Sequence, residues 1–265
     1  MYKKLAIATT ITALGLLGAC NDENHGDKAA AHNDNKAAHT SHWSYEGNTG
    51  PAHWNHVSPD YALCATGKKQ SPINITNSEK ADLPALEFNY KPIPLAIQNN
   101  GHSIKMPADT AGTLTIGKDT YKLLQFHTHS PSEMTIDGKP ADMVIHMVHQ
   151  NTKGELAVVA IHFKVGDTAN PVIEQLWKVM PKTAGKVQSH DKVQIDVNQL
   201  LPTDQNYYAF EGSLTTPPCS EGVRWMVLKQ KVSISAEQLA QHKALYPNNV
   251  RPVQALNGRK ILSSN

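Results

Sequence analysis

Three histidines on two predicted strands constrain the fold of this chain more than any other feature of its sequence. His127 and His129 stand two residues apart, and His146 lies in the apolar segment Val-Ile-His-Met-Val. Side chains two apart on a β-strand point to the same face of the sheet, so one strand presents two imidazoles together. Asp137-Gly138 predicts a turn between the two segments, and antiparallel pairing would add His146 as a third nitrogen. Three nitrogens with an open fourth position are the coordination of a catalytic zinc ion.

The length and charge of the chain narrow the function classes. Its 265 residues suffice for one large or two small domains. It carries 25 basic and 23 acidic side chains, and loss of Lys3 and Lys4 with a cleaved signal would leave 23 of each. This near-neutral balance argues against a nucleic-acid-binding surface. The sequence has no apolar run of about 18 or more residues that would span a membrane.

The N-terminus has the pattern of a bacterial export signal. Residues 1–19 combine Lys3-Lys4 with an apolar run. The sequence Leu17-Gly18-Ala19-Cys20 resembles the lipobox of bacterial lipoproteins, in which the cysteine carries the lipid; ordinary cleavage nearby is the alternative. Residues 20–41 are polar and contain several histidines, so we expect a flexible tether. We therefore expect an exported protein of the periplasm or cell envelope that meets the membrane only through a lipid on Cys20.

The folded domain is predicted to cover residues 42–265, where short alternating runs dominate the sequence. Frequent Gly and Pro separate these runs, as in β-rich proteins. Two helices are expected, from Asn170 to Val179 and from Ser235 to Tyr246, each with a polar capping residue at its start. Strands are expected at 114–116, 121–126, 143–148, 156–163 and 223–229. These features predict a single, mainly β (α+β) domain.

Several short motifs, taken together, resemble those of the α-class carbonic anhydrases from residue 42 to near the C-terminus. They are His42-Trp43-Ser44-Tyr45, Gln70-Ser71-Pro72-Ile73-Asn74-Ile75, Asn99-Asn100-Gly101-His102, the histidine segment 125–133, His146-Met147-Val148-His149 and the segment 211–219. No single motif is decisive, but all follow the order found in the family. The resemblance implies a central, mostly antiparallel twisted sheet of about ten strands with a few short peripheral helices.

The resemblance also implies the chemistry. His127, His129 and His146 would hold Zn²⁺, which lowers the pKa of its bound water to about 7 and so generates a hydroxide that attacks CO2. Thr215 would accept a hydrogen bond from that hydroxide and donate one to an ionised Glu133. The expected activity is the reversible hydration of CO2 to bicarbonate and a proton, a lyase reaction. Primary sulfonamides and small anions are expected to inhibit it.

Further roles follow from the same resemblance. Thr216 would contact bicarbonate, and Gln125 would hydrogen-bond one zinc histidine from behind. His102 would carry the product proton to solvent, since histidine titrates near neutral pH, whereas His149 and His162 are expected to be structural. Because CO2 has no net dipole, its site should be apolar. The matching apolar wall comprises Val148, Val158, Leu214 and Trp225.

The chain has three cysteines, an odd number, so one of them should have a separate role. Cys64 and Cys219 match a pair in exported bacterial members of the family, which implies a disulfide in an oxidising compartment. This bridge would tie the N-terminal part of the domain to the loop of Thr215 and Thr216. The sequence is compatible with a monomer or a homodimer. We expect no nucleic-acid partner.

Two positions depart from the family pattern within one cluster. The residue two before the third zinc histidine is usually Glu and is here Val144, and the residue after Glu133 is often His and is here Met134. A zinc-bound imidazole has a second ring N–H, which a carboxylate, carbonyl or water normally accepts. Val144 cannot accept it, so we expect a water or a backbone carbonyl to serve His146.

Two alternatives compete with this interpretation. The spacing from His127 through His129 to Glu133 also fits a cupin metalloenzyme, in which Glu133 would bind the metal. Against it, Pro140 is followed by Ala141-Asp142 and not by the glycine of the second cupin motif. The other alternative is a non-catalytic, zinc-binding surface lipoprotein. Inactive members of the resembled family typically lose zinc histidines, and all three are present here.

Overall fold

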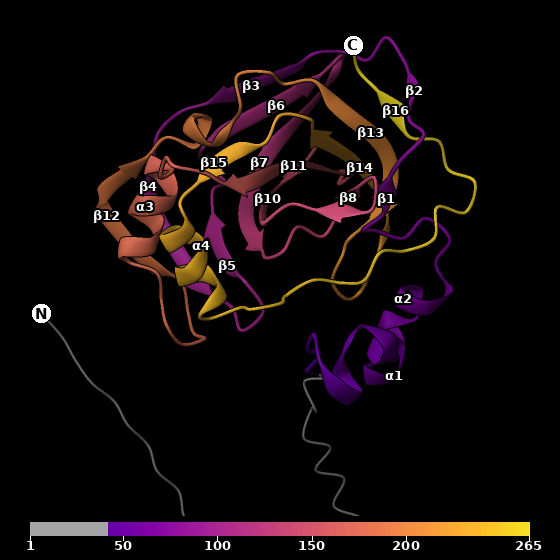
Figure 1. The fold of residues 1–265 in the computed structure, drawn as a ribbon, viewed down its shortest axis with the longest axis horizontal. Helices are drawn as coiled ribbons and strands as arrows, with labels where there is room; N and C mark the ends of the chain where they lie inside the picture. The colour runs from indigo at the N-terminus through magenta and orange to yellow at the C-terminus, as the bar shows by residue number, and fades with distance from the viewer. Residues whose placement is uncertain (1–41) are drawn as a thin grey trace, which may run out of the picture. The chain divides into compact units, whose positions relative to one another are not determined.

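The computed structural model describes residues 42–265. A large twisted β-sheet forms the centre of the fold (Figure 1). The expected signal, the expected tether and Cys20 lie outside the described residues. The longest path through the sheet is β12 (Gln188–Ile195), β4 (Ile93–Asn99), β5 (Ile104–Pro107), β7 (Asp119–His129), β10 (Met143–Gln150), β11 (Leu156–Val165), β14 (Glu221–Leu228), β13 (Tyr207–Ser213), β16 (Leu262–Ser263) and β2 (Glu79–Lys80).

Three more strands complete this sheet of 13 strands: β3 (Leu86–Tyr90), β6 (Gly112–Ile116) and β15 (Val232–Ile234). Pairing is antiparallel except between β11 and β14, β11 and β15, and β16 and β2. A separate small sheet joins β1 (Asn74–Ile75), β8 (Thr135–Ile136) and β9 (Lys139–Pro140). The predicted mainly β domain with a large, mostly antiparallel sheet is thus confirmed. Four of the five expected strand segments lie within strands, and the fifth, 223–229, extends one residue beyond the end of β14 at Leu228.

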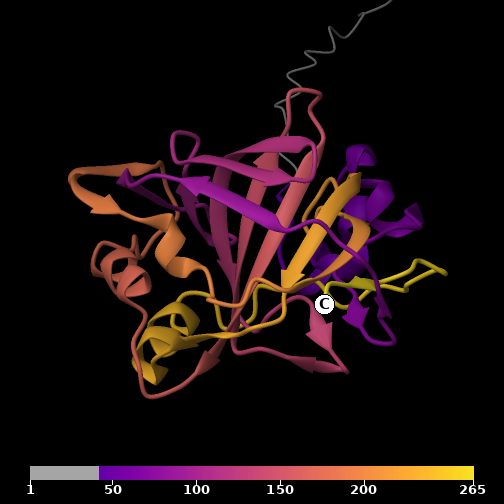
Figure 2. The same ribbon diagram turned by 90° about the horizontal axis from the view of Figure 1, so that it is seen from above.

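Two helices lie where the capping signals placed them. In α3 (Pro171–Lys178), the Asn170 side chain accepts hydrogen bonds from two backbone N–H groups of the first turn. In α4 (Ala236–Lys243), Ser235 and Gln238 form a reciprocal capping box. Such caps satisfy backbone donors that have no partner inside the helix. Both helices lie on one side of the molecule in Figures 1 and 2.

The N-terminal part of the domain is built from short helical pieces that periodicity did not predict. They are η1 (Gly47–Thr49), η2 (Pro51–His53), α1 (Trp54–Val57), η3 (Pro59–Tyr61) and α2 (Leu63–Thr66); a fourth 3-10 segment, η4 (Val197–Leu200), follows β12. Trp54 holds this part together, since its ring is fully buried and its Nε1–H donates to the carbonyl of Ser44. Figure 2 shows the N-terminal helical pieces, α1 and α2 among them, on the side opposite α3 and α4.

The central strand β10 is buried on both faces, so its sequence is an apolar run instead of an alternation. Met143, Ile145 and Met147 point into the larger hydrophobic core. Val144 and Val148 point into a smaller core on the other face. His146 lies between these two valines in the alternation and therefore shares the face of the smaller core, which is where the predicted site must lie.

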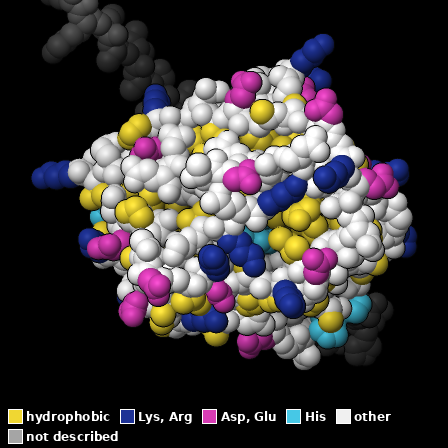
Figure 3. Space-filling model, turned by 45° about the horizontal axis from the view of Figure 1, so that its top comes forward, with side chains coloured by type: hydrophobic (Ala, Val, Ile, Leu, Met, Phe, Trp, Pro, Cys, Tyr) yellow, Lys and Arg dark blue, Asp and Glu magenta, His cyan; other side chains and the backbone are white. Residues whose placement is uncertain are grey.

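The described helices include none that is both long and apolar enough to cross a bilayer. On the face that Figure 3 shows, basic and acidic side chains are interspersed among apolar ones.

Candidate metal centre

The pairing of β7 with β10 brings the three histidines together. The strands are antiparallel, with His146 directly opposite His127 and Val144 opposite His129. Each of the three imidazoles offers a nitrogen within 4.8 Å of the others. Asp137 and Gly138 form a tight turn with φ of 49° and 76°, but this turn joins β8 to β9 inside the connection between the two histidine strands. The predicted strand pairing and histidine cluster are both found.

Two of the histidines are fixed from behind through Nδ1. His127 Nδ1 lies 2.9 Å from Oε1 of Gln125, the residue predicted for this contact. His129 Nδ1 lies 2.6 Å from the carbonyl oxygen of Asn249, to which it donates. With Nδ1 protonated, the lone pair of each ring is on Nε2. His129 Nε2 is buried and has no hydrogen-bond partner, as expected for a nitrogen that binds a metal ion.

The third imidazole, that of His146, faces the cluster with Nδ1 and not with Nε2. Oε2 of Glu133 lies 3.6 Å from His129 Nε2 and 3.7 Å from His146 Nδ1, so these two nitrogens converge on one point. His146 Nε2 is therefore directed away from the cluster, and it is buried without a partner. The backbone carbonyl that we considered as its acceptor does not fill this role.

The electrostatics of the cluster keep the rings of His127 and His146 neutral. Burial lowers the pKa of His127, and the neighbouring His129 and Lys105 lower it further. The pKa of His146 falls well below its usual range, first through burial and then through His129, His127 and His162. A neutral imidazole has the lone pair that a metal requires. The donor set therefore fits Zn²⁺, for which three imidazoles and an open position suit catalysis.

Glu133 lies beside the cluster but is not one of its metal-capable groups. Its Oε1 accepts a 2.9 Å hydrogen bond from the backbone N–H of Arg251. Its Oε2 is buried without a hydrogen-bond partner, so the expected bond from Thr215 is not formed among the described residues. Thr215 itself is buried, and Thr216 is partly exposed.

The predicted apolar wall is assembled on the same face of the sheet. Val148, Val158 and Trp225 belong to the smaller core, and Leu214 packs against it. The Trp225 ring stands edge-on to His146 with centroids 4.9 Å apart, and its Nε1–H donates to the Ser213 carbonyl. An apolar surface thus adjoins the histidine cluster.

His102 lies in the connection between β4 and β5, at the edge of a cavity that His42, Tyr45 and Tyr246 also line. Its ring stacks on Trp43 with centroids 3.7 Å apart and planes 9° apart. Burial, and secondarily His42, lowers the pKa of His102 to about 4. In this position the ring is a weaker base than a proton carrier at neutral pH requires.

Asn249 is a site residue to which the sequence analysis gave no role. Its carbonyl holds His129, and its side-chain Nδ2 donates to the carbonyl oxygens of Thr128 and His102. It therefore links the metal strand to the segment of His102. No local sequence signal could have pointed to it, because these contacts span more than a hundred residues.

The expected disulfide between Cys64 and Cys219 is present, with Cα atoms 5.1 Å apart. It joins α2 to the connection between β13 and β14, which carries Thr215 and Thr216. Both sulfurs pack with Trp54 in a third, small hydrophobic cluster. The predicted tie between the N-terminal part and this connection is confirmed.

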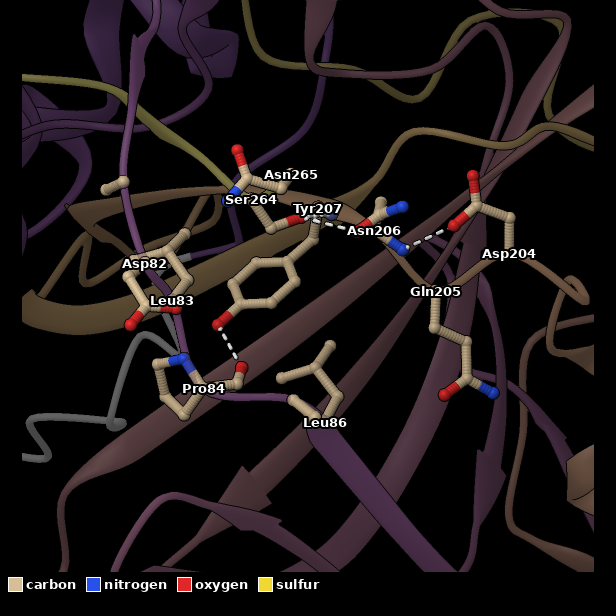
Figure 4. Close-up of a pocket in the computed structure, with 12 residues that line it drawn as sticks. Asp82, Leu83, Pro84, Leu86, Asp204, Gln205, Asn206, Tyr207, Ser264 and Asn265 are labelled. Carbon is tan, nitrogen blue, oxygen red and sulfur yellow. Dashed lines mark hydrogen bonds between the residues drawn. The ribbon is translucent and has the colours of Figure 1, made fainter.

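Another pocket, drawn in Figure 4, lies near the C-terminus and includes none of the predicted site residues. Tyr207 donates there to the Pro84 carbonyl, and Ser264 contacts Asn206. Its polar groups largely satisfy one another, so the histidine cluster is the better candidate for chemistry.

Comparisons with known proteins agree with this geometry. The family model described as eukaryotic-type carbonic anhydrase matches residues 49–265. A carbonic anhydrase of Pectobacterium carotovorum is 44% identical over 227 residues, which cover 85% of this chain and 92% of that protein. The α-carbonic anhydrase of Thermovibrio ammonificans, solved with the inhibitor sulfanilamide, superposes with a TM-score of 0.79 at 42% identity and covers 83% of this chain and 98% of its own.

A hyperthermostable carbonic anhydrase from a hydrothermal vent chimney superposes with a TM-score of 0.80 at 41% identity, over 84% of this chain and all of its own. These matches remove the cupin alternative, because they extend over the whole described domain and not only over the histidine motif. The chain belongs to the eukaryotic-type, or α-class, family of carbonic anhydrases.

Proposed function

We propose that the protein catalyses the reversible hydration of CO2 to bicarbonate and a proton with one zinc ion held by His127, His129 and His146. The observation that carries this proposal is the convergence of two free imidazole nitrogens on one point beside Glu133, next to an apolar wall. When bound, zinc supplies an open position in which a water molecule has a pKa of about 7. All other contributions come from the chain itself.

The apolar wall of Val148, Val158, Leu214 and Trp225 receives CO2. A nonpolar substrate gains from leaving water for such a surface, whereas the charged product does not. Bicarbonate therefore leaves the wall readily after it forms. Thr216, partly exposed beside this wall, contacts the anion before its release.

Glu133 and Thr215 orient the attacking oxygen. Glu133 Oε2 has free acceptor capacity, and Thr215 is buried in the adjoining connection. In this arrangement the Thr215 hydroxyl donates to Oε2, which leaves its oxygen free to accept a hydrogen bond from the nucleophile. A hydroxyl so oriented admits a protonated oxygen and disfavours ligands without a proton to donate.

His102 carries the product proton away. In its stack on Trp43 the ring has a pKa of about 4, so it would bind the proton weakly there. Rotation out of the stack into the adjoining cavity would return the ring to water and raise its pKa toward 6.5. We therefore propose that His102 accepts the proton in an unstacked position.

The protein acts outside the cytoplasm in this proposal, anchored by a lipid on Cys20. The Cys64–Cys219 disulfide supports an oxidising compartment. The signal and lipobox patterns support export and anchoring.

Stopped-flow CO2 hydration, with metal analysis of the same sample, tests the proposed function. We expect one zinc per chain and a hydration rate well above buffer, inhibited by a primary sulfonamide. Zinc-replete, folded protein with no activity above buffer would leave the non-catalytic alternative as the better one. Removal of zinc by a chelator is the matched control and should abolish the activity.

A further inference from the structure

His162 lies on the same face of the sheet as the metal cluster. In the pairing of β10 with β11, His162 stands directly opposite Val144, and His146 stands opposite Ala160. His162 and His146 are thus diagonal neighbours on one face, within reach of each other for side chains of this length. The expectation that His162 has a purely structural role took no account of this register.

Three ring nitrogens at this place have no partner. His162 is 1% exposed, yet neither its Nδ1 nor its Nε2 makes a hydrogen bond. His146 Nε2 is also buried and unpaired. Buried polar groups are nearly always hydrogen-bonded, directly or through an enclosed water, because leaving them unpaired is costly. The unpaired nitrogens of His146 and His162 therefore indicate a hydrogen-bonded link between the two rings.

The other side chains considered as partners of His146 Nε2 either have no acceptor oxygen or are already engaged. Val144 and Met134 are fully buried and have no oxygen. The carboxylate of Asp142 is engaged, since it accepts a 2.7 Å hydrogen bond from the backbone N–H of Val165. Oε2 of Glu133 is unengaged too, but it faces Nδ1 of His146 and not Nε2. Among the described residues, His162 is thus the unengaged side chain that we assign to Nε2 of His146.

We propose that His162 is the positioning residue for the third metal ligand, His146. Its ring accepts the hydrogen bond of His146 Nε2–H through one enclosed water, in place of the glutamate that is usual in the family at position 144. Ala160, directly opposite His146, presents only a methyl group on this face of the sheet. The inference rests on the proposed function, since it concerns the hold on zinc.

The chemistry of His162 suits this role. Burial, with a smaller effect of Lys231, lowers the pKa of His162 to about 4, so the ring is neutral at pH 7. A neutral imidazole has one acceptor nitrogen and one donor, and both can bond to an enclosed water. Such an acceptor fixes the orientation of His146 but transfers less charge to it than a carboxylate does.

Zinc release from the metal-loaded, full-length domain to an excess of chelator tests this role. His162→Phe keeps a ring of similar shape but removes both nitrogens, and we expect zinc loss about 10–100-fold faster. His149→Phe is the matched control, because His149 is equally buried on the same strand as His146 but bonds to Tyr90 on the opposite face. It should release zinc at the wild-type rate.

A second substitution separates positioning from simple packing. Val144→Glu in the His162→Phe background supplies a new acceptor and should restore slow release. His162→Gln keeps an acceptor oxygen, and its rate of zinc release should stay close to that of the wild type. This variant still tests the proposal if His162→Phe does not fold. Folded, zinc-loaded His162→Phe that releases zinc as slowly as the wild type overturns this inference alone. A wild type that binds no zinc overturns the proposed function as well.

Discussion

The backbone N–H of Arg251 donates a 2.9 Å hydrogen bond to Oε1 of Glu133, the carboxylate beside the three histidines. The buried Arg251 guanidinium donates in turn to the Gln70 side chain and to the carbonyl oxygens of Ser71 and Cys64. Burial lowers the pKa of Arg251 to about 10, so it remains a cation at neutral pH. The position of Glu133 is therefore tied to the segment that carries the disulfide.

Removal of the disulfide should weaken this connection. The double variant Cys64→Ser/Cys219→Ser opens a covalent loop that spans 155 residues of sequence. We expect a loss of about 2–5 kcal/mol in the free energy of unfolding, as is typical for native disulfides. Chemical denaturation of the variant and of the reduced wild type should give matching midpoints below that of the oxidised protein. Equal midpoints for all three, or two free thiols in exported protein, would contradict this.

Replacement of His102 by alanine should slow turnover more than the CO2 step itself. The reason is that His102 is the proposed proton carrier, while its ring stacks on Trp43 and is not one of the three proposed zinc ligands. The loss should be largest at low buffer concentration, and added imidazole should rescue it. Isotope exchange at equilibrium, which does not depend on proton transfer to solvent, is the control. An unchanged rate in dilute buffer would reject the role.

Cys20 should carry a lipid in the exported protein. The lipobox pattern predicts cleavage directly before it, so the intact mass should correspond to a chain that begins at Cys20 with added acyl groups. Cys20→Ser should yield a protein that can be extracted from the cell envelope without detergent. A soluble wild-type product that starts after residue 20 would count against the anchor.

Acid should destabilise the fold because several buried histidines resist protonation. Burial lowers the pKa of His149 and of His162 to about 4, and that of His242 to about 3. Their unfolded value is about 6.5. Between these values the unfolded chain binds more protons, so stability is fully present above pH 6.5 and declines as the pH falls toward 4.

Each buried ring should contribute a slope of up to about 1.4 kcal/mol per pH unit in this window. Denaturation midpoints of the zinc-free protein at pH 7, 6 and 5 measure the combined slope. His149→Phe removes one titrating ring and should reduce the slope by about one proton. A slope that stays the same in this variant would show that the ring does not titrate as proposed.

The sequence could predict the metal strands because their signals are local. The spacing of His127 and His129 fixes their common face, and the apolar run around His146 marks a central strand. The two capped helices were predictable for the same reason. The N-terminal pieces α1 and α2 are only four residues long and have no periodicity to detect. Trp54 and the disulfide, not helix propensity, hold them in place.

The contacts behind the site could not be predicted from local signals. Arg251 reaches Glu133 across 118 residues, and Asn249 reaches His129 across 120. Likewise, the face of β11 on which His162 lies depends on its register with β10, which no local pattern specifies. Tertiary pairing decides these positions.

The two departures from the family pattern predict a weakened hold on zinc. Val144 and Met134 are both fully buried, and Met134 Sδ lies 3.3 Å from the backbone nitrogen of Ile73, which donates to it. A glutamate at position 144 would give His146 Nε2–H a charged acceptor. In Val144→Glu alone, the His146 N–H would be one partner of that carboxylate, but its remaining acceptor capacity would lie unpaired in an apolar core, which lowers the stability of the fold.

The double variant Met134→His/Val144→Glu supplies that partner, because an imidazole at position 134 can donate to the new carboxylate. A carboxylate acceptor transfers more charge to the His146 ring than a neutral one, so zinc should be held more tightly. We expect release to a chelator about 10–100-fold slower than in the wild type. Thermal unfolding of the zinc-free proteins is the control for general stabilisation. If the folded double variant loses zinc as fast as the wild type, the acceptor at this position does not govern the hold on the metal.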